Sequence, residues 1–326
     1  MDRRAFIAGV TALSSTPNVT RAQSPSKVYR VGCLWPVPAP APRARAALEA
    51  GLRDLGWQPG TDILFEHRFA DRQSDIPGLA VSLVAARVAV IVAFTPLVIA
   101  GAARATTEIP IVMVAGEDPR RSGFAVSLAR PGENITGITF TSPEQLAKSL
   151  EILKALVPGM TRVQILRNPD AYPPTGPYVT ALETTARALR LAILFSDVRT
   201  REDIERVVPD LGQPRVSAIF AMPDAFATAR HGALIAVLAL MHRLPALLGL
   251  RDWAQGGELA SYGPDQFEDV RRAAFFVDRI LRGARARDLP IERPSRLKLV
   301  INLRTAGALG LTVPGSLLQR ADQVIE

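Results

Sequence analysis

The fold class follows from one stretch of the chain, Val88-Ala89-Val90-Ile91-Val92-Ala93-Phe94-Thr95-Pro96-Leu97-Val98-Ile99-Ala100-Gly101-Ala102-Ala103. It is the longest weakly charged stretch, but it is shorter than the ~20 apolar residues that a membrane-spanning helix needs. β-branched residues fill its first part and small helix-forming residues its second, with Pro96 at the change. The stretch therefore predicts a buried strand that feeds a helix rather than a membrane span.

The same alternation of strand and helix patterns continues on both sides of that stretch. The expected strands are residues 28–35, 63–69, 88–94, 109–114, 135–140, 162–166, 192–196, 216–221, 246–250, 258–262 and 297–301. The expected helices are residues 43–56, 76–86, 96–106, 143–156, 178–189, 201–208, 228–242 and 267–282. Strands that alternate with helices of this length predict an α/β protein whose parallel sheets are flanked by helices.

The chain has 326 residues, a length that fits two domains or two lobes of one fold. The strand and helix pattern starts again after residue 140, so we expect a boundary near residues 138–142. We expect an N-terminal α/β lobe at residues 27–140 and a C-terminal α/β lobe at residues 141–257. Residues 258–326 are expected to form a crossover segment that contributes to both lobes.

Residues 1–22 have the pattern of an export signal. Arg3 and Arg4 give a basic start, residues 6–13 form a short apolar run, and residues 20–22 match a cleavage site. The two arginines followed by Ala5 and Phe6 resemble a signal of the twin-arginine type. The alternative is a basic, frayed N-terminus on a cytosolic protein. The signal predicts an exported, periplasmic protein.

The positive charge is diffuse. The formal net charge is +8, from 39 Lys plus Arg against 31 Asp plus Glu, and removal of residues 1–22 leaves +6. No helix-turn-helix pattern precedes the first strand, and no aromatic residues interleave with a basic patch, so nucleic-acid binding is not expected. The single cysteine, Cys33, excludes a disulfide within the chain and is expected to be a buried strand residue.

The motifs of common catalytic sites do not occur in the sequence. There is no Gly-x-Ser-x-Gly, no Gly-x-Gly-x-x-Gly after a strand, no phosphate-binding Gly-x-x-x-x-Gly-Lys and no His-Glu-x-x-His. His231 and His242 lie on one expected helix, ~16 Å apart at the helical rise, so they cannot share a metal ion. We therefore expect no catalytic residue, no metal and no cofactor.

Several specific segments resemble one known family. They are Leu55-Gly56-Trp57, Ile109-Pro110-Ile111-Val112, Leu128-Ala129-Arg130-Pro131-Gly132-Glu133-Asn134-Ile135-Thr136-Gly137, Ser261-Tyr262-Gly263-Pro264-Asp265 and the tail from Val300 to Glu326. With the export signal and the architecture, they resemble the tryptophan/tyrosine-type substrate-binding proteins of ABC transporters. The resemblance implies the two-lobed type I periplasmic binding fold.

The resemblance also implies a function. The protein is expected to capture a small amphiphilic solute, such as an amino acid or a related carboxylate, by lobe closure and to deliver it to an ABC permease in the cytoplasmic membrane. The mature protein is expected to be a soluble monomer or weak dimer. The alternatives are a periplasmic ligand-sensing module for a receptor and an α/β enzyme, which the missing nucleophile and base disfavour.

The residues just after each strand are the expected ligand contacts, because ligands of open parallel sheets bind beyond the carboxyl ends of the strands. Thr95 opens a helix directly after a strand, so its hydroxyl and the free N–H groups of that turn can hold a carboxylate, or it is an N-cap without a ligand. The family usually has Gly-Gly-Thr-Pro here. In this chain Phe94 and Pro96 flank Thr95, and Phe94 either narrows the pocket or turns into the core.

Further contacts are expected on both lobes. Asp118 and Asp224 can receive an ammonium group or sugar hydroxyls, or can cap the following helix. Trp35 and Tyr262 are expected to sandwich an apolar or aromatic ligand body, and Asn168 follows a strand of the second lobe. These residues, with Phe94, Thr95 and Pro96, make up the predicted ligand site.

Overall fold

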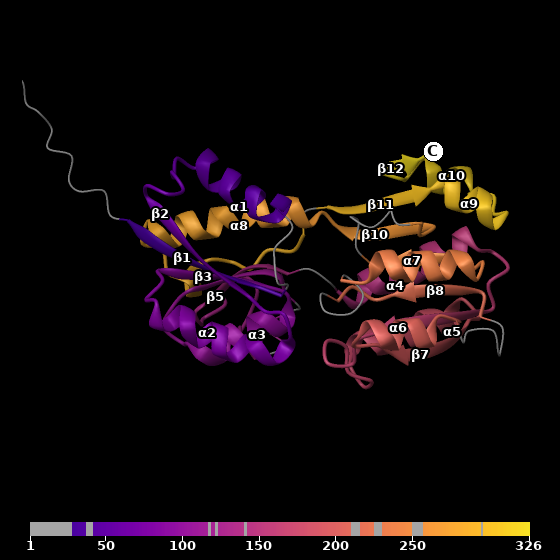
Figure 1. The fold of residues 1–326 in the computed structure, drawn as a ribbon, viewed down its shortest axis with the longest axis horizontal. Helices are drawn as coiled ribbons and strands as arrows, with labels where there is room; N and C mark the ends of the chain where they lie inside the picture. The colour runs from indigo at the N-terminus through magenta and orange to yellow at the C-terminus, as the bar shows by residue number, and fades with distance from the viewer. Residues whose placement is uncertain are drawn as a thin grey trace, which may run out of the picture.

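The computed structural model describes residues 28–36, 42–116, 119–120, 123–139, 142–209, 216–224, 230–249, 257–294 and 296–326. They form two lobes, each built on one sheet with helices on both faces (Figure 1). The expected export signal lies outside the described residues. No helix in the described part of the chain has the length and apolar character needed to cross a membrane.

The first lobe contains a five-stranded, wholly parallel sheet in the order β2-β1-β3-β4-β5. Its strands are β1 (Tyr29–Trp35), β2 (Ile63–Phe69), β3 (Val90–Phe94), β4 (Ile111–Gly116) and β5 (Ile135–Thr139). Its flanking helices are α1 (Pro42–Asp54), α2 (Ile76–Ala85), α3 (Pro96–Ala105) and α8 (Gln266–Leu281). The inner strands β1, β3 and β4 and the strand β5 are largely buried, which explains their apolar runs, whereas the edge strand β2 is only partly buried.

Alternate residues of these strands supply two separate cores. Cys33, Val92 and Val112 pack with α1 and α8 on one face. Leu34, Ile91 and Met113 pack with α2 and α3 on the other. This is the two-residue period of a strand, and it confirms that Cys33 is a buried strand residue.

The second lobe contains a seven-stranded sheet in the order β12-β11-β10-β9-β8-β6-β7. Its strands are β6 (Arg162–Arg167), β7 (Ala192–Asp197), β8 (Ala218–Ala221), β9 (Ala246–Leu248), β10 (Ala260–Pro264), β11 (Leu297–Asn302) and β12 (Gln323–Ile325). Its helices are α4 (Pro143–Leu156), α5 (Pro177–Ala188), α6 (Arg201–Val207), α7 (Gly232–Met241), α9 (Leu303–Leu309) and α10 (Gly315–Leu318). One core lies under α4 and α5, and a second one lies under α6 and α7.

The predicted elements agree with the structure to within two residues at each end, except that the helix expected at residues 228–242 begins at Gly232. The prediction of parallel sheets is wrong for one pair, because β11 runs antiparallel to β10. The sequence also did not predict β12, α9 and α10. All three are short elements, and β12 is held by its pairing with β11.

The chain crosses between the lobes beside α8. The strand β10 belongs to the second sheet, whereas the helix α8 that follows it lies against α1 on the first (Figure 1). The chain then returns to the second sheet as β11 after Glu292, whose backbone N–H donates to the oxygen of Gly137 and whose oxygen accepts from the N–H of Thr139. These crossings lie together on one side of the molecule.

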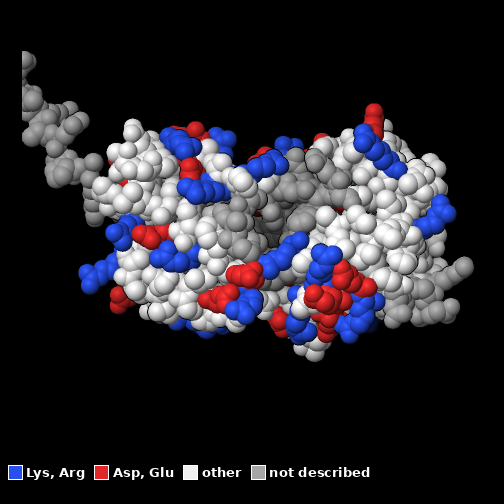
Figure 2. Space-filling view, viewed as in Figure 1, with Lys and Arg blue, Asp and Glu red and all other residues white. Residues whose placement is uncertain are grey.

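Charges of both signs are mixed on the surface. Figure 2 shows Lys and Arg side chains beside Asp and Glu side chains on both lobes, without one dominant basic patch on the face in view. Among the described residues, several arginines form ion pairs with neighbouring acids, such as Arg45 with Glu49 and Arg201 with Glu205. Part of the positive charge is thus offset locally by acids.

Candidate functional site

Thr95 has an unusual backbone conformation. It joins β3 to α3 with φ 74° and ψ 154°, a region that is almost restricted to glycine. A β-branched residue in this region stores strain of about 1–3 kcal/mol. Strain of this size persists only where the surrounding structure fixes the backbone, and it is concentrated at ligand sites in many proteins.

The hydroxyl of Thr95 has no hydrogen-bond partner among the described residues. Its Oγ1 atom is buried and makes no hydrogen bond, although Thr95 is the N-cap residue of α3. Thr95 therefore holds the N-cap position, as one of the two alternatives expected, but its side chain does not cap the helix. The first turn of α3 keeps the donor groups of a helix N-terminus, and an unpaired hydroxyl lies beside them.

The next strand of the sheet has a second irregularity at the same edge. Ala115 has φ 58°, and the register of β4 against β5 shifts between Met113 and Gly116. Val114 nevertheless accepts a hydrogen bond from the N–H of Thr95, so the ends of β3 and β4 are tied together. The carboxyl edge of the first sheet is therefore locally distorted where ligands of parallel sheets bind.

Three other non-glycine residues with positive φ have a simpler cause. Arg87, Arg190 and Arg243 have φ between 51° and 56°, and each follows the C-cap residue of a helix. This is the position at which helices commonly end in a left-handed residue. The distortion at Thr95 and Ala115 lies instead at strand ends.

Phe94 turns into the core. Its ring stacks on that of Trp35, with centroids 3.9 Å apart and planes 10° from parallel. Phe94 is 5% exposed and Trp35 is 3% exposed. The indole N–H of Trp35 donates to Nδ1 of His67 on the edge strand β2, at 3.1 Å. Phe94, Trp35 and His67 thus form an aromatic cluster that ends at the residue before Thr95. Pro96, the residue after Thr95, is the first residue of α3.

Asn168 and Asp224 lie together on the second lobe. They follow β6 and β8, which are neighbours in the sheet, and the Nδ2 of Asn168 donates to Oδ1 of Asp224 at 3.2 Å. Both are buried, at 0% and 8% exposure. The hydroxyl of Tyr172 donates to the oxygen of Pro223 at 2.6 Å and fixes the same turn. The structure thus brings two of the predicted ligand contacts together in one polar pair, and their contact with a ligand stays a prediction.

Tyr262 and Trp35 belong to different cores. Tyr262 is half-buried against the core under α4 and α5, and burial raises the pKa of its hydroxyl. Trp35 packs in the core between the first sheet, α1 and α8. The predicted sandwich of a ligand between these two rings stays a prediction. Asp118 lies outside the described residues.

Gln145 was not predicted. It is the third residue of α4, it is 5% exposed, and its Nε2 atom is buried without a hydrogen-bond partner. Its backbone N–H donates to Oγ of Ser142, which caps the helix. A Gln three residues after a capping Ser usually bonds back to the cap. The spacing of Ser142 and Gln145 was therefore visible in the sequence, but it indicated a helix cap rather than an amide without a hydrogen-bond partner.

Several of the described residues carry groups that can bind a polar ligand. Burial raises the pKa of Cys33 far above its usual range, so its thiol stays protonated in the core. Within the described ranges, no three His, Cys, Asp or Glu side chains are grouped so that they could hold a metal ion. Thr95, Gln145, Asn168 and Asp224 offer hydroxyl, amide and carboxylate groups to a polar ligand.

Comparison with known proteins gives a consistent result. The profile of the family described as ABC transporter substrate binding protein matches residues 31–325. A tyrosine-binding protein from Clostridioides difficile (strain R20291) is 22% identical over 302 residues, which cover 91% of this chain and 86% of that protein.

Two solved structures show the same fold. One is an ABC domain from Streptococcus pneumonia in complex with L-Trp, which is 25% identical with a TM-score of 0.81, over 92% of this chain and 100% of that one. The other is the ligand-free, open structure of a substrate binding protein with adhesive properties from Clostridium difficile. It is 20% identical with a TM-score of 0.67, over 91% of this chain and 99% of that one. The predicted two-lobed type I periplasmic binding fold is confirmed.

Proposed function

Because this chain belongs to the family of ABC transporter substrate-binding proteins, we propose that it is the extracytoplasmic solute-binding component of an ABC importer. It captures a small amphiphilic solute between its lobes and presents it to a permease in the cytoplasmic membrane. The export signal predicted at residues 1–22 supports a periplasmic location, and the family supports a binding protein without enzymatic activity.

The observation that carries the proposal is the unpaired hydroxyl of Thr95 on a strained backbone. It lies at the N-terminus of α3, where partial positive charge favours an anion, so it suits the carboxylate of an amino acid. Two similar proteins, one described as tyrosine-binding and one solved with L-Trp, support an aromatic amino acid as the solute.

The second lobe supplies the other side of the site. The buried pair of Asn168 and Asp224 presents a carboxylate and an amide at the carboxyl edge of its sheet. A carboxylate of this kind suits an ammonium group. The proposed binding mode therefore places the carboxylate of the ligand on Thr95 and its ammonium group on Asp224, with closure of the lobes bringing the two together.

The sensing role is the second candidate. The same fold can present a ligand-bound surface to a receptor instead of a permease, and the chain itself does not distinguish these partners. Reconstitution with the candidate permease and its ATPase in liposomes distinguishes them. Ligand-dependent uptake supports the importer, whereas binding without uptake by any cognate permease supports the sensor.

A thermal-shift screen of amino acids, aromatic acids and nucleosides tests the ligand class, because a ligand that binds only the folded state raises the melting temperature. Calorimetric titration of the hits should give a Kd of about 1 μM, which corresponds to about −8 kcal/mol. L-tryptophan and L-tyrosine are the expected hits. If no amino acid or related carboxylate shifted the melting temperature of ligand-stripped protein, the proposed ligand class would be wrong.

A further inference from the structure

Asp269 is a buried acid without a partner. It lies in the first turn of α8, is 5% exposed, and its Oδ2 atom makes no hydrogen bond. A buried carboxyl group that lacks a donor loses its hydration without compensation. The group therefore favours any ligand that brings a donor to it.

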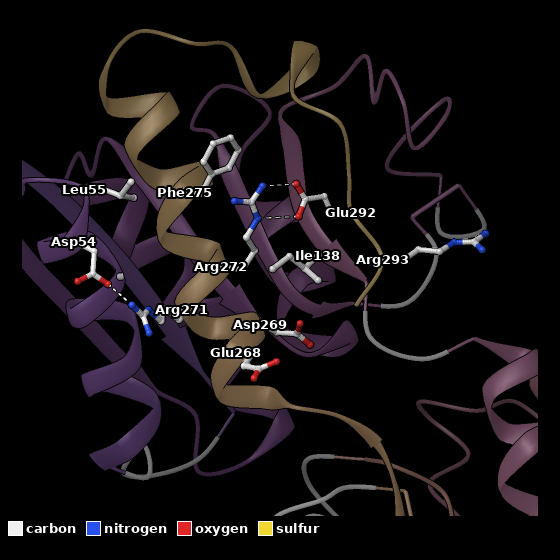
Figure 3. Close-up of a pocket in the computed structure, with 11 residues that line it drawn as sticks. Asp54, Leu55, Ile138, Glu268, Asp269, Arg271, Arg272, Phe275, Glu292 and Arg293 are labelled. Carbon is white, nitrogen blue, oxygen red and sulfur yellow. Dashed lines mark hydrogen bonds and ion pairs between the residues drawn. The ribbon is translucent and has the colours of Figure 1, made fainter. Parts of the chain in front are cut away.

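Asp269 lines a cavity of about 420 Å³ that we name the α8 pocket. The pocket lies between α1, α8, β5 and residues 292–293 (Figure 3). Leu55, Ile138 and Phe275 form its apolar walls. The volume is within the range of about 300–1,000 Å³ typical of small-molecule sites. None of the predicted ligand contacts that the structure describes lines it, so the pocket is distinct from the proposed cleft site in its lining residues.

The arginines of the α8 pocket are already paired with acids. Arg272 makes two hydrogen bonds to the carboxylate of Glu292, at 2.9 and 2.7 Å, and Arg271 makes one to Asp54 at 2.6 Å. Figure 3 shows Arg293 pointing away from these side chains, and it is exposed. The pocket therefore offers no free guanidinium group near Asp269 to an anion.

The other acids next to Asp269 are also paired. The Nζ of Lys298 donates to Asp265 at 2.8 Å and to Glu268 at 3.2 Å. No cation pairs with Asp269 among the described residues. The unmatched group of the pocket is thus one carboxyl, which shares the pocket with paired charges and with the apolar side chains of Leu55, Ile138 and Phe275.

We propose that the α8 pocket is a second binding site, which takes a small organic ammonium ion with an apolar body. The ammonium group donates to the Asp269 carboxylate, and the body packs against Leu55, Ile138 and Phe275. Because Glu292 begins the return of the chain to the second lobe, a ligand here also lies against a crossover between the lobes.

Binding at this site is linked to pH. Burial, with the negative charges of Asp265 and Glu268, raises the pKa of Asp269 to about 7. The ammonium ion prefers the ionised carboxyl, so binding near neutral pH releases a proton. Affinity therefore rises with pH through this range. The remaining charged groups around the pocket are Asp54, Arg271, Arg272, Glu292, Arg293 and Lys298.

The test uses cyclohexylammonium as the probe and cyclohexanol as its neutral analogue, both titrated calorimetrically into the whole protein. We expect saturable binding of the ammonium ion and binding of the alcohol weaker by about tenfold or more. Asp269→Asn should weaken ammonium binding by about tenfold or more. Asp288→Asn is the matched control, because it makes the same substitution at a side chain that is 54% exposed and does not line the pocket, and it should change affinity by less than about twofold.

Two further measurements test where the probe binds and how its affinity depends on pH. The methyl resonances of Ile138 should shift on addition of the probe, and affinity should rise from about pH 6 to about pH 8. Absence of saturable binding would overturn the proposal, as would equal losses in both variants or an affinity that does not change with pH. If Asp269→Asn does not fold, the comparison with cyclohexanol and the pH series on the unmodified protein decide the question.

Discussion

Arg230 and Asp71 connect the two lobes. The Nη1 of Arg230 donates to the main-chain oxygen of Asp71 at 3.1 Å and lies 3.7 Å from its carboxylate. Asp71 follows β2 in the first lobe, and Arg230 precedes α7 in the second. Because the two residues belong to different lobes, the contact depends on how closely the lobes approach each other.

Removal of this contact should favour the open form. Arg230→Gln should weaken binding of the cleft ligand by about two- to fivefold, since an exposed ion pair contributes about 0.2–1 kcal/mol. Calorimetry measures the effect. The control is Arg285→Gln, whose pair with Asp288 lies within one turn of the chain and should not affect binding. An affinity equal to that of the unmodified protein in Arg230→Gln contradicts a role in closure.

Substitution of Thr95 should separate stability from binding. Thr95→Gly relieves the strained backbone and should raise the free energy of unfolding by about 1 kcal/mol. It also removes the unpaired hydroxyl and should weaken ligand binding by about 1–3 kcal/mol, as should Thr95→Ala. Urea unfolding and calorimetry measure the two effects.

Arg87→Gly is the matched control for Thr95→Gly. Arg87 also has a positive φ, but it follows the end of α2, away from the carboxyl edge of the sheet. The Arg87→Gly variant should gain up to about 1 kcal/mol in the free energy of unfolding, and its affinity for the cleft ligand should not change. Unchanged affinity in Thr95→Gly as well would place the ligand elsewhere.

Asp224→Ala should weaken both binding and folding. It removes a carboxylate from the proposed site and takes the acceptor from the buried Nδ2 of Asn168. We expect a loss of about 1–3 kcal/mol in ligand affinity and a similar loss in the free energy of unfolding. Asp170→Ala is the control, because its pair with Arg199 is exposed and should be worth at most about 1 kcal/mol. An Asp224→Ala variant with full affinity would remove this residue from the site.

Asp269 should make the protein less stable as the pH rises. Its pKa is raised from 3.8 to about 7 in the folded state, so the folded state binds the proton more tightly than the unfolded state. The free energy of unfolding should therefore fall between these two pH values. Asp269→Asn lacks this titration, so it should match the unmodified protein near pH 4 and exceed it at pH 8 by on the order of 2–4 kcal/mol. A pH-independent difference between the two proteins would contradict the burial of this charge.

The sequence predicted most of the fold because strands rich in apolar residues and amphipathic helices each leave a clear local pattern. The helix at Pro143–Leu156 and the strand at Ile63–Phe69 have the predicted bounds. The direction of β11 and the existence of β12 could not be predicted in this way. Their pairing is set by contacts with distant segments, such as the hydrogen bond from the N–H of Leu299 to the Asp322 carboxylate.

The candidate site was only partly accessible from the sequence. Ligands of parallel sheets bind beyond the carboxyl ends of the strands, and the sequence pattern shows where the strands end. Thr95, Asn168 and Asp224 could therefore be proposed as candidates from the sequence. The strain at Thr95 could not be predicted, since a Thr-Pro sequence does not specify a positive φ. Asp269 follows Glu268 in a helix start that looks solvated, and only the packing of α8 distinguishes the buried acid from the exposed one.

Lobe closure around an amino-acid-like solute is the central claim, and small-angle X-ray scattering tests it most directly. The protein is stripped of ligand by unfolding and refolding and is then measured alone and with saturating L-tryptophan, or with L-tyrosine if that binds more tightly. The account predicts a smaller radius of gyration with ligand, and a smaller change for Thr95→Ala at the same ligand concentration. An unchanged radius of gyration at a concentration that calorimetry shows to be saturating would contradict it.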